Sequence, residues 1–283
     1  MAHHTTSTDP TRAAAPARAA QSPLDGGKGR LRRTVRTLAR RTIPLLVVAA
    51  AWAAISRLAT IDPLFLPSPG LVWNAFTDMA PLLPGAIAYS MGTLLTGFAA
   101  GCAAAILLGL AMAYSKIIRY SIEGLVDALR PVPVFALIPL FMLWLGIGRP
   151  PQVLLVAFGC FVIVVVSTSE AIRNVPAIFM NAASTLGASR ARVYRTVVVP
   201  AITPQILGGV RAAGSAAFGL EVAAELIGAQ DGLGHMMITN QLYLRTEGIL
   251  VAIAVFTLLA LILDAIIRFA GGRLVRWSGR GPA

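Results

Sequence analysis

Long stretches of mostly apolar residues with few charges recur along the chain and set the first expectation about its fold. A helix needs about 20 mostly apolar residues to cross the hydrocarbon core of a membrane. The chain holds six candidates, at residues 42–61, 90–114, 126–148, 150–169, 205–228 and 248–268. The second lies in the longest uncharged stretch, residues 79–115. The pattern predicts an all-α polytopic membrane protein with about six transmembrane helices.

The composition excludes an ordinary soluble protein. Of the 283 residues, 57% are hydrophobic and only 13% are charged, whereas charged residues make up about 25% of soluble domains. A single water-soluble core of this length does not hide so many apolar side chains.

Basic residues outnumber acidic ones by 24 to 12, for a net charge of +12, and their positions alternate along the chain. Nine precede the first apolar stretch, none lies in residues 60–90, and further groups fall at 116–119, 173–195 and 268–280. Because Lys and Arg favour the cytoplasmic side, the alternation predicts six crossings with both termini cytoplasmic. The excess of basic residues therefore indicates how the chain is oriented in the membrane, and it gives no support for nucleic-acid binding.

The same patterns divide the chain into three regions. Residues 1–41 are rich in Ala, Arg, Pro, Ser and Thr, and we expect a mobile basic cytoplasmic tail that is too long and too basic for a secretory signal peptide. Residues 42–277 form the transmembrane domain, and residues 278–283 form a C-terminal tail. Within the domain, the cytoplasmic segment 174–203 is longer than the other connections, and long connections tend to be functional.

The segment after the first apolar stretch contains a helix start. Ser68 precedes Pro69, which fits an N-cap followed by the first helical position. Leu71, Trp73 and Phe76 then favour a short helix, which lies either on the outer membrane surface or against the other helices.

Motifs for nucleotide, metal and hydrolytic chemistry are absent from the sequence. A Walker loop needs a lysine followed by Ser or Thr, and neither Lys28 nor Lys116, the two lysines of the chain, is followed by either. Neither H-E-x-x-H nor G-x-S-x-G occurs, and Cys102 and Cys160 lie singly inside apolar stretches. We therefore expect no catalytic residue, no metal site and no cofactor bound by this chain.

The cytoplasmic segment 174–203 has the pattern of two short helices. A first helix is expected before Gly187, where the pattern breaks, and a second helical stretch runs up to Pro200, which is expected to end it. Ala182 and Ala183 are small enough for another surface to approach closely. The segment therefore predicts a compact pair of helices on the cytoplasmic side.

The spacing within this segment is the most specific signal in the sequence. It runs Asn181-Ala182-Ala183, three residues, Gly187, nine residues, then Val197-Val198-Val199-Pro200. This resembles the cytoplasmic signature of the inner-membrane permeases of binding-protein-dependent ABC importers: E-A-A, three residues, G, nine residues, I-x-L-P. Every spacing matches, although Asn181 stands where the family has glutamate and valines stand for Ile and Leu. The alternative is a structural cytoplasmic loop with ordinary helix caps.

Other segments extend the resemblance over approximately residues 64–277, and they are similar to the branch that imports nitrate, taurine and aliphatic sulfonates. They are Arg130-Pro131-Val132-Pro133, Thr185-Leu186-Gly187-Ala188-Ser189, Val222-Ala223-Ala224-Glu225-Leu226-Ile227-Gly228 and Gly232-Leu233-Gly234. The branch also includes importers of bicarbonate, cyanate, thiamine precursors and aromatic carboxylates, so the resemblance does not fix the substrate.

The resemblance implies a type I ABC importer permease fold with cytoplasmic coupling helices, in the inner membrane of a bacterium. It implies a second copy of this chain, surrounding membrane lipid, and an extracytoplasmic substrate-binding protein. It also implies two cytoplasmic ATPase subunits, which bind the ATP and Mg that this chain has no motif to hold.

The resemblance also implies roles for individual residues. It assigns the coupling to the ATPase to these residues: Asn181, Ala182, Ala183, Leu186, Gly187, Ala188, Ser189 and Pro200. Pro131 and Pro133 are candidates for the translocation path because they interrupt the third apolar stretch, and broken helices in membranes are tolerated where they line a cavity. Simple kinking for packing is the alternative for both prolines.

Ionisable residues inside the last two apolar stretches are further candidates, because their burial in lipid is costly. Glu221 and Glu225 are four residues apart and share one helix face. We expect Glu225 to act in a gate or an interhelical hydrogen bond, with direct substrate contact or a purely structural polar contact as alternatives. Arg211 is a third candidate in this stretch, and Asp264 and Arg268 have the spacing of a local ion pair.

Three classes of function fit the sequence. The leading hypothesis is the permease subunit of an ATP-driven importer for a small anion. A stand-alone secondary transporter or channel, which needs no ATPase, is the alternative, and a membrane scaffold without transport is a third class. Association with an ATPase subunit discriminates between them.

Overall fold

The computed structural model describes residues 43–44, 46–56 and 62–274. The expected tails 1–41 and 278–283 lie outside these residues, as do parts of the first expected span. The chain divides into two units, Met1–Ala59 and Thr60–Ala283. In the first unit, the described residues include an apolar helix, Leu46–Ser56.

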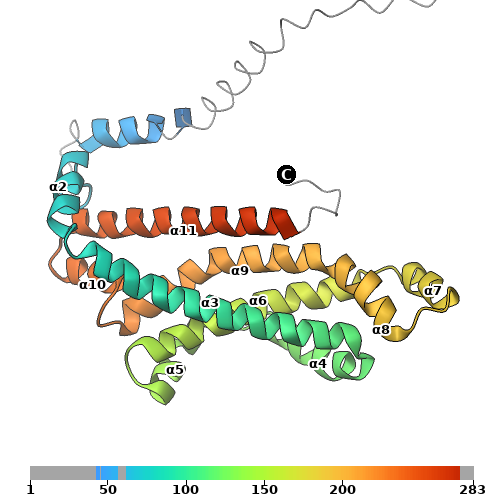
Figure 1. Cartoon of the computed structure of the whole chain (residues 1–283). Helices are drawn as coiled ribbons and strands as arrows, with labels where there is room; N and C mark the ends of the chain where they lie inside the picture. Colours follow the sequence, from blue (N-terminus) through green and yellow to red (C-terminus); the bar gives the residue numbers. More distant parts are fainter. Residues whose placement is uncertain (1–42, 45, 57–61, 275–283) are drawn as a thin grey trace, which may run out of the picture. The chain divides into compact units, whose positions relative to one another are not determined.

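The second unit is built from helices, which Figure 1 shows in sequence colours. In chain order they are α2 (Pro69–Met79), α3 (Leu83–Tyr114), α4 (Lys116–Leu129), a 3-10 turn (Val134–Leu137), α5 (Ile138–Leu145), α6 (Arg149–Arg173), α7 (Ala177–Thr185), α8 (Arg190–Val193), a π-helical turn (Tyr194–Val198), α9 (Val199–Gly228), α10 (Leu233–Leu242) and α11 (Thr246–Leu274). Every regular element among the described residues is helical, which confirms the all-α prediction.

Four of these helical segments are long and apolar enough to cross a membrane: Leu83–Tyr114, Arg149–Arg173, Arg190–Gly228 and Thr246–Gly271. The helix pair Lys116–Leu129 and Val134–Leu145, bent by 92°, provides a fifth crossing if it is one broken span. The described part of the first expected span is shorter than the roughly 20 residues that a crossing needs. The described residues therefore contain four or five spans, and the expected count of six is not confirmed.

The third expected span, 126–148, differs from the prediction at its start. Lys116 and Arg119 were expected in a loop, but they belong to α4. Ser115 ends α3 in an extended conformation, and its Oγ accepts a hydrogen bond from the N–H of Ile118 at 3.4 Å. A single serine N-cap thus starts a new helix directly, without a loop.

The prolines interrupt the third span as predicted. α4 ends at Leu129, and the chain continues through Arg130-Pro131-Val132-Pro133 into the 3-10 turn. Proline lacks the N–H that continues a helix, and it disfavours helical geometry at the preceding residue. Pro131 and Pro133 therefore account for the sharp bend between α4 and the 3-10 turn.

α3, α6 and α9 pack side by side and form the centre of the second unit (Figure 1). Leu94, Leu155 and Ala213 are fully buried in this core. Small residues let membrane helices approach closely. A Cβ atom at Gly97 would lie 2.8 Å from the carbonyl oxygen of Val153, so the backbones of α3 and α6 meet where α3 has no side chain.

The expected short helix after Ser68 is present as α2. Ser68 is its N-cap, and the Ser68 Oγ accepts a hydrogen bond from the N–H of Leu71 at 3.4 Å. Of the two expected placements, packing against other helices is observed, because α2 lies on α11. Trp73 nevertheless remains exposed.

We predict that Gly101→Ala lowers the free energy of unfolding by about 1–3 kcal/mol, the usual cost of overpacking. A Cβ atom at Gly101 would collide with the backbone carbonyl of Ala157 on α6. Denaturant titration of the detergent-solubilised protein measures the change. Gly85→Ala on the same helix is the control, because nothing lies within 4 Å of its added Cβ atom. Equal stabilities for the two variants would contradict the close packing.

Candidate functional site

α7 and α8 form a compact projection at one end of the second unit, which we call the knob, residues 177–193 (Figure 1). α7 follows Pro176, whose extended backbone sets the start of the helix. α8 follows Ser189, and the Ser189 Oγ accepts a hydrogen bond from the N–H of Arg192 at 3.4 Å. The knob therefore consists of two short helices joined around Gly187.

The end of α7 explains the spacing between Ala183 and Gly187 in physical terms. The N–H of Ala188 donates to the carbonyl of Ala183 at 3.1 Å, and the N–H of Gly187 donates to the carbonyl of Ser184 at 3.0 Å. These two bonds form a Schellman cap, which needs a left-handed residue at its turning point. Gly187 has φ +79° and supplies it.

The outer surface of the knob is apolar and exposed. None of the α7 side chains is buried. Ile178, Phe179 and Leu186 are 70%, 59% and 88% exposed. Grouped apolar side chains of this kind mark an interaction surface. Asn181 and Ala182 are also exposed on α7, and Ala183 is half-buried.

Pro200 does not end a helix, and this expectation was wrong. Residues Arg190–Gly228 form one continuous helical segment, with a π-helical turn at Tyr194–Val198. Pro200 lies in the first turn of α9, where an N–H is not required. The N–H of Val199 bonds the carbonyl of Tyr194 five residues back, so the widened turn carries the helix past the proline. The other seven expected coupling residues lie together in the knob.

Pro131 and Pro133 lie beside an ion network between α4 and the end of α6. Arg130 donates to Glu170 at 2.8 Å and to Asp127 at 3.1 Å, and Arg173 pairs with Glu123 at 3.1 Å. These side chains are partly exposed, so each pair stabilises little by itself, but together they hold the bend against α6.

Glu225 joins three helices at the opposite end of the core. Its carboxylate accepts hydrogen bonds from the Oγ of Ser90 on α3 and from the N–H of Gly234 on α10, both at 2.6 Å. The Ser90 Oγ in turn accepts from the N–H of Leu233 at 2.9 Å. The first N–H groups of a helix have no partner within it. Glu225, 1% exposed, and Ser90 satisfy two of those of α10. We call these contacts the Glu225 cluster.

Two glycines make room for this carboxylate. Gly232 has φ +103°, and a Cβ atom there would collide with the Oε1 of Glu225. A Cβ atom at Gly234 would lie 2.5 Å from the Cβ of Glu225. The Gly232-Leu233-Gly234 segment is therefore shaped to the Glu225 side chain.

Glu221 lies one turn before Glu225 and is fully buried. Among the described residues, neither of its carboxyl oxygens has a hydrogen-bond partner. The structure therefore places Glu225 in interhelical hydrogen bonds, which is one of the roles expected for it. Glu221 takes no part in those bonds.

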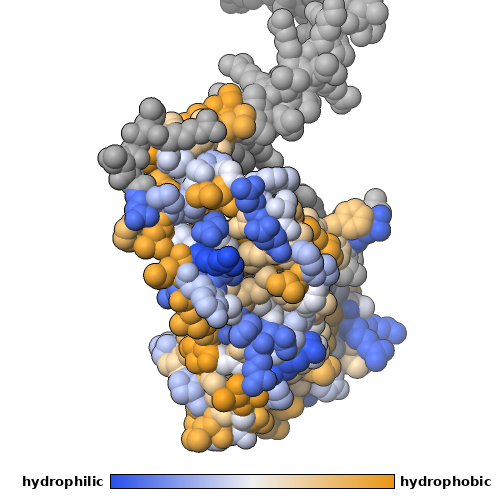
Figure 2. Space-filling model, turned by 90° about the vertical axis from the view of Figure 1, so that its left-hand side faces the viewer, coloured by the Kyte–Doolittle hydropathy of each residue, from blue (hydrophilic) through white to orange (hydrophobic). Residues whose placement is uncertain are grey.

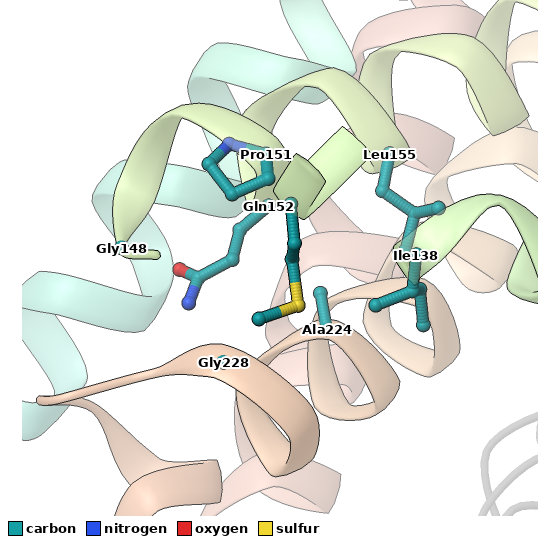
Figure 3. A pocket seen from close by; sticks show the side chains of 8 residues that line it. Ile138, Gly148, Pro151, Gln152, Leu155, Ala224 and Gly228 are labelled. Carbon is teal, nitrogen blue, oxygen red and sulfur yellow. The ribbon is translucent and has the colours of Figure 1, made fainter. Parts of the chain in front are cut away.

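A small apolar pocket lies next to this region, with room for about one water molecule (Figure 3). Gln152 is 2% exposed at its wall, and its Nε2 has no partner among the described residues. The Oε1 of Gln152 accepts a hydrogen bond from the Tyr89 hydroxyl at 3.5 Å. The lining residues come from α5, α6 and α9 and the turn before α6: Ile138, Met142, Gly148, Pro151, Gln152, Leu155, Ala224 and Gly228.

The four expected pathway residues do not form one site. Ala224, beside Glu225, lines the pocket together with Gln152 near the start of α6. The bend with Pro131 and Pro133 is bonded to Glu170 near the end of α6. With a rise of 1.5 Å per residue, residues 152 and 170 are about 27 Å apart along α6. The structure thus separates the prolines from the glutamates.

Figure 2 shows the end of the molecule that faces left in Figure 1, where α2 and α10 lie. Hydrophilic residues gather in the middle of this face, and hydrophobic residues lie along its left and lower edges. An end face of this kind fits contact with water, because the sides of a membrane bundle are apolar.

Asp264 of α11 makes two further polar contacts, one within its own helix and one to α9. Asp264 pairs with Arg268 at 3.0 Å, as its spacing predicts. The same carboxylate binds Arg211 of α9 at 3.0 Å, which the sequence did not indicate. Sequence reasoning also missed Ser90, although a serine inside an apolar stretch is itself a signal of interhelical bonding. No group of three or more potential metal ligands occurs in the described part of the chain.

Comparison with known proteins identifies relatives of this chain. Residues 101–276 match the family described as binding-protein-dependent transport system inner membrane component. The chain is 33% identical to the taurine transport system permease protein TauC of Escherichia coli, over 83% of this chain and 88% of that protein. It is 30% identical to the putative aliphatic sulfonates transport permease protein SsuC of Bacillus subtilis, over 82% and 84%.

The fold also matches a solved structure. An inward-facing structure of the MetNI methionine ABC transporter aligns over 72% of this chain and 99% of that chain, with a TM-score of 0.56 and 18% identity. This likeness concerns the fold alone and agrees with the type I importer permease fold. The chain belongs to the family of inner-membrane permeases of binding-protein-dependent ABC importers, as residues 181–200 predict, and to the branch that includes the taurine and aliphatic sulfonate permeases, as the segments 130–133, 185–189, 222–228 and 232–234 predict.

Proposed function

We propose that two copies of this chain form the translocation path of an ATP-driven importer for a small sulfonate-type anion. The observation that carries this proposal is the exposed, apolar knob, which is capped at Gly187 and positioned by Ser189. A rigid projection with an apolar surface is suited to docking into another protein. Family membership makes an ATPase subunit the natural occupant.

The substrate class rests on the relatives. TauC is named for taurine, which is itself a sulfonate, and SsuC is named for aliphatic sulfonates. In this proposal an extracytoplasmic binding protein selects the substrate, since the pocket beside Gln152 and Ala224 leaves room for only about one water molecule.

The orientation follows from charge. The knob and the ion network of Arg130 and Arg173 lie at the same end of α6. We place this end in the cytoplasm, because basic residues favour that side. Both termini are then cytoplasmic, and the Glu225 cluster lies towards the outer side, where it works as part of a gate. ATP and Mg are bound by the two partner ATPases.

The first test is assembly and transport. We expect the chain, co-expressed with an ATPase subunit and a binding protein from the same genome, to purify with two ATPases. Taurine or an alkanesulfonate on the binding protein then stimulates ATP hydrolysis in proteoliposomes, with nitrate and acetate as the comparison anions. Transport without any ATPase would instead support a stand-alone transporter or channel, and stimulation by nitrate alone would overturn the sulfonate assignment.

A second prediction concerns Gly187. We expect Gly187→Glu to abolish substrate-stimulated ATP hydrolysis while leaving membrane insertion intact. A left-handed conformation costs most residues about 1–2 kcal/mol, and the new carboxylate would face the apolar docking surface. Gly187→Asn is the matched control, because asparagine tolerates this conformation and carries no charge. Unchanged coupling in the Gly187→Glu protein would show that the knob has no part in it.

A third prediction concerns the Glu225 cluster. In Ser90→Ala the N–H of Leu233 loses its acceptor, and a buried unsatisfied group costs about 1–3 kcal/mol. We expect faster hydrogen exchange at residues 233–236 than in the unaltered protein, measured by mass spectrometry. Thr96→Ala is the control, because its hydroxyl bonds only the carbonyl of Gly92 in its own helix. Equal rates of hydrogen exchange at residues 233–236 in the Ser90→Ala and Thr96→Ala proteins would contradict a role for Ser90 in the proposed gate.

A further inference from the structure

Arg190, in the second helix of the knob, and Tyr194, in the π-helical turn that follows it, fasten this segment to the last turn of α3. We propose that these two are positioning residues for energy coupling, which deliver the movement of the knob to α3. The proposal rests on the proposed function, because it takes the knob to be the part that an ATPase moves. Neither residue belongs to the spaced motif that indicated the knob.

Arg190 binds the end of α3 directly. Its guanidinium donates a hydrogen bond to the carbonyl of Tyr114 at 2.6 Å, and its Cζ lies 5.3 Å from the centre of the Tyr114 ring. Tyr114 is the last residue of α3, where carbonyl groups lack partners within the helix. The negative end of the helix dipole also attracts a cation at this point. Arg190 therefore caps α3 from another part of the chain.

Tyr194 makes the second attachment, four residues further on and on the same face. Its hydroxyl donates to the carbonyl of Leu110 at 3.0 Å. Its ring stacks edge to face on Tyr114, with the ring centres 5.2 Å apart and an angle of 82°. Tyr194 also begins the π-helical turn, so the attachment lies where the helix geometry changes.

The first helix of the knob has no comparable attachment. α7 has no buried residue, and its main neighbours are α8 and the π-helical turn. A push on α7 therefore passes through Gly187 to α8. From α8 it reaches α9 through the continuous backbone and α3 through Arg190 and Tyr194.

The same two helices are joined again at their far ends. Ser90 of α3 is bonded to Glu225 of α9, and Ser90 lies about 36 Å along the helix from Tyr114, at 1.5 Å per residue. Arg190 and Tyr194 thus connect the knob to the helix that carries Ser90. Without them, the knob keeps its backbone connections to α6 and α9 but loses these two attachments to α3.

The chain offers a matched control on the same short helix. Arg192 is exposed, and its side chain has no ion pair or hydrogen bond among the described residues. Removal of Arg192 changes the charge of the knob as much as removal of Arg190. Only removal of Arg190 breaks an attachment to α3.

The experiment uses the assembled complex of permease, ATPases and binding protein in proteoliposomes. The readouts are the ratio of substrate-stimulated to basal ATP hydrolysis, the ATPase content and the melting temperature. We expect Arg190→Ala to lower the stimulation ratio by at least about fivefold, the lower range of coupling between sites, with assembly and melting temperature unchanged. Arg190→Lys should restore most of the ratio, and Tyr194→Phe should lower it to a smaller extent. Arg192→Ala should leave it unchanged.

Two results would overturn the proposal. If Arg190→Ala and Arg192→Ala lower the ratio equally, charge on the knob matters and the attachment to α3 does not. If Arg190→Ala loses the ATPase from the complex, Arg190 is a docking residue instead. Failure of the unaltered chain to bind any ATPase would contradict the proposed function itself, and it is recognised before any variant is compared.

Discussion

A carboxyl group buried among membrane helices is costly unless it is hydrogen-bonded, and the hydrogen bonds of Glu225 join three of these helices. Its two oxygens take the hydroxyl of Ser90 and the N–H of Gly234. Lipid offers no substitute partners, so the arrangement holds only while α3, α9 and the start of α10 stay together. The glycines at 232 and 234 follow from the same constraint, because a side chain at either position would displace the carboxylate.

This constraint gives the helix core two ends with different mechanical properties. At one end α3 and α9 meet through the Glu225 cluster, and at the other they meet through Arg190 and Tyr194. Between these ends α6 fills the space at backbone contact distance, as at Gly97. A close-packed group of helices tends to move as one body, because packed cores do not deform continuously. The first helix of the knob, α7, has no buried residue, so it is held less tightly than that body.

The sequence predicted the parts of this fold that depend on local chemistry. Ser68 before Pro69 starts a helix, Gly187 turns the chain between two short helices, and Asp264 pairs with Arg268 one turn later. Each depends on residues within a few positions of one another. The all-α class and most spans followed from long apolar stretches, whereas Lys116 was misplaced because one serine suffices to start α4.

The contacts that depend on three-dimensional arrangement were beyond such reasoning. Ser90 and Glu225 are 135 positions apart, and Arg190 and Tyr114 are 76 apart. No spacing rule joins them, because the pairing depends on how α3 lies against α8 and α9. The prediction that Pro200 ends a helix was wrong for a related reason. A proline inside an isolated helix interrupts it, but the first turn of α9 tolerates one. The π-helical turn before it begins at Tyr194, which also contacts α3.

The replacement of the family glutamate by Asn181 is consistent with the way the knob is held together. The Schellman cap uses the backbone groups of Ala183, Ser184, Gly187 and Ala188, and no carboxylate takes part. The Asn181 side chain makes no hydrogen bond among the described residues, and it is exposed on α7. Loss of the charge therefore leaves the fold of the knob intact and changes only the surface offered to a partner. That surface is dominated by apolar side chains, so docking here depends on their burial more than on an ion pair at position 181.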